Sequence, residues 1–122
     1  MIQRLSFWIM MIVCSVMVSG QEYDGYYTNP ILPSGADPWV VKHEGWYYYC
    51  CGVLGGIGVS HSRDLHKINP PVRVWKAPEK GQWNSTCIWA PELHFWKGKW
   101  YIFYAGGYSG PPFIHQKTGV LE

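Results

Sequence analysis

The sequence predicts an all-β protein. Aromatic residues make up 17% of the 122 residues and charged residues only 15%, a composition that argues against intrinsic disorder. Short segments rich in aromatic residues alternate with turns that contain glycine and proline, which is the pattern of successive strands. After residue 20, no segment repeats its apolar residues with the period of a helix. We therefore expect one small domain built from β-strands.

The start of the chain is typical of an export signal. Arg4 provides a positive charge, an apolar stretch runs from Phe7 through Val18, and small residues precede the expected cleavage point. This apolar stretch is short for a membrane span, so we expect no stable membrane insertion. The sequence then divides into a signal peptide, residues 1–20, and a folded region, residues 21–122, of a secreted or extracytoplasmic protein.

The first half of the folded region carries four expected strands, at residues 37–43, 46–52, 57–62 and 72–75. The second of these is the clearest, because tryptophan and tyrosine fit the pleated surface of a sheet. Glu44-Gly45 precedes it and Gly55-Gly56 follows it, and both pairs are typical of tight turns. Residues 64–71 then form a loop before the fourth strand.

The second half carries three more expected strands, at residues 92–96, 100–105 and 113–118. Residues 76–86 are polar and include Pro78 and Gly81, so we interpret them as a loop. The strands that follow are again short and aromatic, which favours the same pleated, half-buried surface.

Two stretches of the chain resemble each other. Residues 36–52 align with residues 90–106 at a spacing of 54, which pairs Trp46 with Trp100. Each copy holds an acidic strand, a tight turn and an aromatic strand. A unit that recurs at about 50 residues suggests the blades of a β-propeller, whereas two unrelated hairpins with common turn chemistry explain the pattern equally well.

The length of the chain bears on the choice. A propeller needs at least four blades to close, so we expect either a small β-sandwich or the first two blades of a longer protein. The last residues, 119–122, read as the middle of an element, which favours the second interpretation.

The remaining composition excludes several functions. No cluster of lysine and arginine marks a nucleic-acid surface, and no glycine-rich loop is present to hold a phosphate. Cys50, Cys51 and Cys87 lack the spacing of zinc ligands, and we assign no metal ligand. Neighbouring cysteines on a strand face opposite sides, so we expect Cys50 and Cys51 to be ordinary buried residues.

Two carboxylates lie beside aromatic strands. Asp37 precedes Pro38 at the start of the first expected strand, and Glu92 follows Pro91 at the start of the fifth. Glycoside hydrolysis uses a pair of carboxylates, one to deprotonate water and one to protonate the leaving oxygen, while flat rings can hold the sugars. We expect Asp37 and Glu92 to begin innermost strands and to face one cleft. The alternative is a turn cap at Asp37 and a surface ion pair at Glu92, and spacing alone favours this alternative.

Three further residues are candidates for binding a sugar. His94 lies two residues after Glu92 and therefore shares its side of a strand. Trp39 and Trp89 offer flat rings beside the two carboxylates. An alternative function is a carbohydrate-binding module without catalysis, which would use Trp39, Trp89 and Trp96 as stacking platforms.

Four motifs, taken in register, resemble glycoside hydrolase family 43. They are Asn29-Pro30-Ile31-Leu32 with Ala36-Asp37-Pro38, Gly58-Val59-Ser60-His61-Ser62-Arg63-Asp64-Leu65, Ile88-Trp89-Ala90-Pro91-Glu92-Leu93-His94, and Gly98-Lys99-Trp100-Tyr101-Ile102-Phe103-Tyr104. The resemblance implies a five-bladed β-propeller of which this chain holds about the first two blades. Members cleave polysaccharides or oligosaccharides that contain arabinose or xylose, with inversion and without an organic cofactor, and some hold a metal ion near the propeller axis.

The resemblance also implies roles for the two carboxylates. Asp37 matches the general base that activates water. Glu92 matches the acid that tunes the pKa of the proton donor, a position that is often aspartate. The donor is a glutamate of the third blade, and a chain that ends in the second blade lacks it. We therefore expect a truncated and inactive piece of an exported glycosidase that has a saccharide substrate and no nucleic-acid partner.

Overall fold

The computed structural model describes residues 30–122. The expected signal peptide, residues 1–20, lies outside the described residues, as does Asn29 of the first motif. Residues 30–122 form seven strands and no helix, which confirms the all-β prediction. Accordingly, this part of the chain has no helix with the length and apolar character needed to cross a bilayer.

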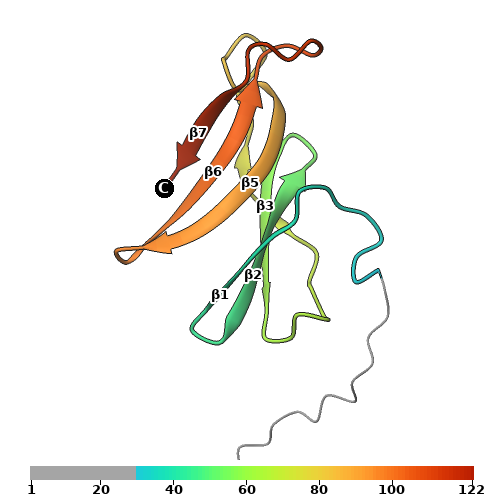
Figure 1. The fold of residues 1–122 in the computed structure, drawn as a ribbon, viewed down its shortest axis with the longest axis vertical. Coiled ribbons are helices and arrows are strands. Elements are labelled where there is room, and N and C mark those ends of the chain that lie inside the picture. Colours follow the sequence, from blue (N-terminus) through green and yellow to red (C-terminus); the bar gives the residue numbers. More distant parts are fainter. Residues whose placement is uncertain (1–29) are drawn as a thin grey trace, which may run out of the picture.

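The strands form two antiparallel sheets (Figure 1). They are β1 (Trp39–His43), β2 (Trp46–Val53), β3 (Gly56–Ser62), β4 (Val72–Lys76), β5 (Thr86–Trp96), β6 (Lys99–Gly107) and β7 (Lys117–Leu121). The first sheet has the order β1-β2-β3-β4 and the second has the order β5-β6-β7. Neighbours in sequence are thus neighbours in each sheet, which is the up-and-down arrangement expected for propeller blades.

The same turn joins the first two strands of each sheet. Both residues of Glu44-Gly45 have positive φ, at 48° and 77°, and so do both residues of Lys97-Gly98, at 48° and 81°. Two central residues with positive φ define a type I′ turn, whose twist matches that of the flanking strands. Glycine at the second position provides this conformation without the cost that a side chain would add.

The core lies between the two sheets. Its buried apolar residues come from both sheets and are Cys50, Ile57, Leu93, Ile102 and Tyr104. Cys50 and Ile57 have no exposed surface at all, so the inner face of the first sheet is fully covered at these positions. Burial raises the pKa of the Cys50 thiol to about 12, which keeps it protonated and unreactive at neutral pH. The expectation that Cys50 and Cys51 are buried residues is confirmed.

One hydrogen bond joins the innermost strands of the two sheets. The indole nitrogen of Trp39, at the start of β1, donates to the backbone oxygen of Leu93 in β5 at 2.8 Å. Trp39 also packs against the core. This bond sets the start of β1 beside the middle of β5, which is where the expected site residues lie.

The first expected strand begins at Trp39 and not at residue 37, so Asp37 lies outside it, and the other bounds agree within two residues except for those of the fifth and seventh strands. The fifth begins at Thr86 and not at residue 92, because pairing with β6 continues through two irregularities. Pro91 is tolerated within it because β5 is an edge strand and needs no donor on its free side. The seventh spans Lys117–Leu121 and not 113–118, since Phe113 has a φ of 57° that a strand does not accept.

Candidate functional site

The position of Glu92 in its sheet differs from the expectation. It lies inside β5 and not at the start of a strand. Aligning the two type I′ turns pairs Asp37 with Ala90 and Trp39 with Glu92, one residue away from the alignment made on sequence alone. Asp37 and Ala90 share a positive φ, 49° and 45°, and each precedes a proline. The two carboxylates therefore occupy different places in the repeated unit.

A bulge around Ala90 gathers the site residues of β5 on one face. Trp89 pairs with Ala105 of β6, and Glu92 pairs with Phe103, with a register shift between the two pairs. Ala105 and Phe103 lie two apart on β6 and so point to the same side. Trp89 and Glu92, three apart in sequence, consequently also share that side, as a bulge permits.

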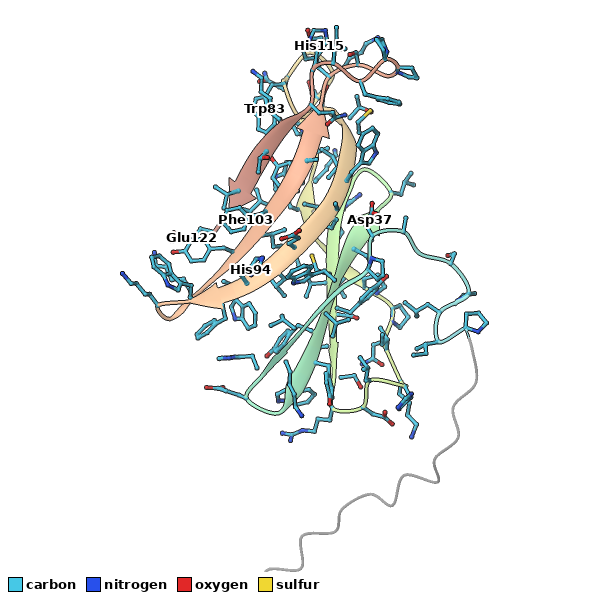
Figure 2. The ribbon with its side chains drawn as sticks, viewed as in Figure 1. Asp37, Trp83, His94, Phe103, His115 and Glu122 are labelled. Atoms are coloured by element: carbon cyan, nitrogen blue, oxygen red, sulfur yellow. The ribbon has the colours of Figure 1, made fainter. Side chains whose placement is uncertain are left out.

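His94 extends this face and contacts Glu92. Its Nε2 lies 3.4 Å from Oε2 of Glu92, and both side chains are about half exposed. Its ring lies 5.0 Å from the ring of Trp39 and 5.7 Å from that of Phe103, between centroids. Figure 2 shows His94 and Phe103 on the same sheet. The imidazole is thus held between two aromatic rings and can donate to or pair with the Glu92 carboxylate.

Asp37 is exposed and lies directly before β1, where Figure 2 places it to the side of Phe103 and His94. Among residues 30–122, no group donates a hydrogen bond to its carboxylate and no cation pairs with it. Asp64 behaves differently, because its Oδ1 accepts a hydrogen bond from the His66 backbone nitrogen at 2.9 Å. Within residues 30–122, the carboxylate of Asp37 thus lacks the backbone hydrogen bond that Asp64 accepts.

The three other expected residues have distinct surroundings. The indole N–H of Trp39 is already used by Leu93, so this ring helps to join the two sheets. Trp89 is 39% exposed on the face that it shares with Glu92. Trp96 is on that face too, but lies at the opposite end of β5, beside the turn, where Lys97 covers its ring at 4.4 Å. The three tryptophans of the alternative binding module thus do not form one platform.

Sequence reasoning missed Phe113. Its ring lies 4.9 Å from that of Trp89 in an edge-to-face arrangement, and 39% of its surface is exposed. Phe113 belongs to residues 108–116, which join β6 to β7. The pattern of the sequence placed it at the start of a strand, and only its positive φ and its contact with Trp89 assign it to the site.

A separate hollow lies on the opposite face of the second sheet. It has a volume of about 590 Å³, and its walls include Val59, Val74, Trp75, Ile102 and Leu121. None of the expected site residues lines it. Its walls are mostly apolar, and Glu122 is the one carboxylate among the described residues that line it.

The described residues provide no metal centre. No three side chains of histidine, cysteine, aspartate or glutamate within residues 30–122 gather so that they could hold an ion. The side chains of residues 30–122 thus form no site by themselves for the metal ion that the resemblance implies for some members, and no step of the chemistry is derived through one.

The family model for glycosyl hydrolases family 43 matches residues 27–121. An alpha-L-arabinofuranosidase of Humicola insolens is 36% identical over 89 residues, which cover 69% of this chain and 18% of that protein. An extracellular exo-alpha-(1->5)-L-arabinofuranosidase of Streptomyces avermitilis is 35% identical over 86 residues, which cover 66% and 18%.

Solved structures agree with these matches. The crystal structure of an alpha-L-arabinofuranosidase from Lactobacillus brevis is similar to this chain with a TM-score of 0.68 and 30% identity, over 77% of this chain and 32% of that one. The fold of this chain is therefore that of a five-bladed β-propeller, of which it holds part. The chain spans 18% of the length of the two curated relatives.

Proposed function

The chain belongs to glycosyl hydrolases family 43, and on this premise we propose that it is the first part of an exported glycosidase that cleaves arabinose-containing oligosaccharides or polysaccharides. Two relatives are named arabinofuranosidases, and one of them is named extracellular. Xylose-containing substrates are the second choice within the same family. The observation that supports a site in this chain is the shared face of Trp89, Glu92 and His94, with Asp37 before the adjacent inner strand.

Asp37 is proposed as the general base of an inverting reaction. Its carboxylate takes a proton from water as the water oxygen bonds to the anomeric carbon. The bond to the leaving oxygen breaks on the opposite side of the sugar, and that oxygen takes a proton from an acid that the rest of the protein would supply. The exposure of Asp37 and the absence of a partner for its carboxylate within residues 30–122 support this role.

Glu92 is proposed to act on the pKa of that proton donor, with His94 binding substrate or steadying Glu92. The contact between His94 and Glu92 supports a shared role for the two side chains. Glu92→Gln should lower kcat/KM and move one limb of its pH profile, because a negative charge near the donor is lost. A pH profile of unchanged shape would remove this role from Glu92.

The proposed function predicts that the 122-residue chain alone hydrolyses very little. General acid catalysis contributes about 10²–10⁴-fold, and the proposal places the proton donor outside this chain. The measurement is release of 4-nitrophenol from 4-nitrophenyl α-L-arabinofuranoside by the purified monomeric chain. Robust turnover would contradict the view that the chain is only part of the enzyme.

The complete protein that carries this chain provides the decisive assay. It should hydrolyse 4-nitrophenyl α-L-arabinofuranoside faster than 4-nitrophenyl β-D-xylopyranoside, and proton NMR should show a first product of inverted anomeric configuration. Retained configuration would overturn the proposed mechanism. Binding of arabino-oligosaccharides without hydrolysis would favour a carbohydrate-binding module.

A further inference from the structure

Residues with an unusual backbone conformation lie on both sides of Trp89 in β5 and in the loop that contacts it. Besides the two turn residues Glu44 and Lys97, the described residues include four with positive φ that are not glycine: Asp37, Cys87, Ala90 and Phe113. The type I′ turns account for the positive φ of Glu44 and Lys97. Such conformations cost about 1–3 kcal/mol each and concentrate at ligand sites. A positive φ is especially rare for a bulky residue such as phenylalanine.

Phe113 and Trp89 form an open aromatic pair at the upper end of β5. Trp89 and Phe113 are each 39% exposed, although their rings contact each other at 4.9 Å. Loop residues 108–116, which hold Phe113, reach over the end of the second sheet, where Figure 2 labels His115. The pair therefore offers ring surface to a ligand while each ring holds the other in place.

The position of this pair relative to Glu92 sets the length of the ligand. The β6 partners of Trp89 and Glu92, Ala105 and Phe103, lie two residues apart on the same face. Two residues of a strand span about 7 Å, which is comparable to the length of one sugar unit. A saccharide with one unit beside Glu92 would consequently place the next unit against Trp89.

The chemistry of the loop favours a neutral ligand. Residues 108–116 contain no aspartate, glutamate, lysine or arginine, whereas they include hydroxyl, amide and imidazole groups. Tyr108 and His115 stack with centroids 4.5 Å apart, which adds another aromatic surface to the loop. A sugar presents apolar C–H groups to an aromatic face and hydroxyls to polar neighbours, while a nucleic acid would need cations.

We propose that Phe113, together with Trp89, forms a binding subsite for the sugar unit adjacent to the one whose bond is cleaved. This inference rests on the proposed function, because it places the cleaved unit beside Glu92. Phe113 is then a residue that determines specificity for chain length, and takes no part in proton transfer.

The experiment compares long and short substrates in the complete protein. For wild type, Phe113→Ala, Phe113→Tyr and Ile114→Ala, kcat/KM is measured on α-1,5-linked arabinotriose and on methyl α-L-arabinofuranoside, which has no second sugar. An aromatic contact is worth about 0.5–1.5 kcal/mol, so Phe113→Ala should lower the ratio of the two values by about fivefold. Phe113→Tyr keeps the ring and should keep the ratio, as should Ile114→Ala, which changes an exposed neighbour in the same loop.

The outcomes separate this inference from the proposed function. If Phe113→Ala leaves the ratio of the two kcat/KM values unchanged, the subsite is overturned and the glycosidase is not. The same holds if both kcat/KM values fall together, as they would if another part of the protein covers the aromatic pair. A wild-type protein that hydrolyses neither these substrates nor xylotriose and methyl β-D-xylopyranoside would overturn the proposed function, and the subsite with it.

Discussion

The two sheets repeat one hairpin and differ in what surrounds it. Each opens with two strands joined by a type I′ turn, Glu44-Gly45 in the first sheet and Lys97-Gly98 in the second. The first sheet has β1 directly after Asp37-Pro38, whereas β5 extends past the equivalent Ala90-Pro91 and carries a bulge there. The two hairpins share the turn that sets their strand pairing, and the candidate site lies at the bulge of β5, where the hairpins differ.

Equivalent faces of the two sheets also differ in how far their side chains are buried. The face of the first sheet that carries Trp39 and Cys50 packs against the second sheet, and Cys50 is fully buried. The equivalent face of the second sheet carries Glu92 and Phe103, and Phe103 is 43% exposed. Equivalent positions therefore differ in burial, because within residues 30–122 only the first sheet has another sheet packed against this face.

The largest effect expected from this comparison concerns Leu93 and its equivalent, Val40. Leu93 is 4% exposed in the core between the sheets, while Val40 is 41% exposed. Leu93→Ala should lower the free energy of unfolding by about 2–5 kcal/mol, since it leaves a cavity in a packed core. Val40→Ala should cost much less. Urea unfolding followed by tryptophan fluorescence tests the pair, and equal losses would show that the equivalence is misplaced.

The two turn glycines should respond alike. Gly45 and Gly98 have positive φ, and an added Cβ would meet no atom within 4 Å at either position, so conformational strain alone sets the cost. Gly45→Ala and Gly98→Ala should each cost about 1–2 kcal/mol. Gly110→Ala is the control, because Gly110 has the same open space without a positive φ. A clear difference between the two turn variants would break the proposed repetition of the hairpin.

A smaller effect is expected at Trp39. Trp39→Phe removes the donor to the Leu93 oxygen, and the loss of one such bond costs about 0.5–1.5 kcal/mol. Trp89→Phe is the matched control, since the Trp89 indole has no hydrogen-bond partner within residues 30–122. Equal unfolding free energies for the two variants would mean that the bond between the sheets contributes nothing.

The last of these predictions leaves the sequence unchanged and varies pH. Burial raises the pKa of Cys50 from 9.0 to about 12 and that of Tyr49 from 10.0 to about 12. Both groups are neutral when protonated, so their contribution to stability is complete below pH 9 and is lost as pH rises toward 12. Unfolding free energy should therefore fall across this range. Cys50→Ala should reduce the slope, and an unchanged slope would contradict burial of a neutral thiol.

Local chemistry made much of the fold predictable. The aromatic strands 46–52 and 100–105 and the turn glycines carry their own signal, so the hairpins could be located without tertiary contacts. The bulge at Ala90 could not be located in this way, because the pairing of Trp89 and Glu92 depends on their partners in β6. The alignment on sequence alone matches Ala36 with Ala90, whereas the structural equivalent of Ala90 is Asp37.

The candidate site was predictable in its residues and less so in its arrangement. Glu92, His94 and Trp89 were named from the sequence, and the structure brings them to one face. The contact between Phe113 and Trp89 joins a loop residue to a strand distant in sequence, so no local pattern could reveal it. The roles of Asp37 and Glu92 stay predictions that activity must test.

The general-base role of Asp37 is the central claim, and one substitution tests it directly. In the complete protein, Asp37→Asn keeps the shape of the side chain but cannot accept a proton from water. We expect kcat on 4-nitrophenyl α-L-arabinofuranoside to fall by about 10²-fold or more, while the affinity for arabinose stays within a few-fold of wild type. Asp64→Asn, which makes the same change outside the site, should keep normal turnover. Near-normal turnover of Asp37→Asn would contradict the account.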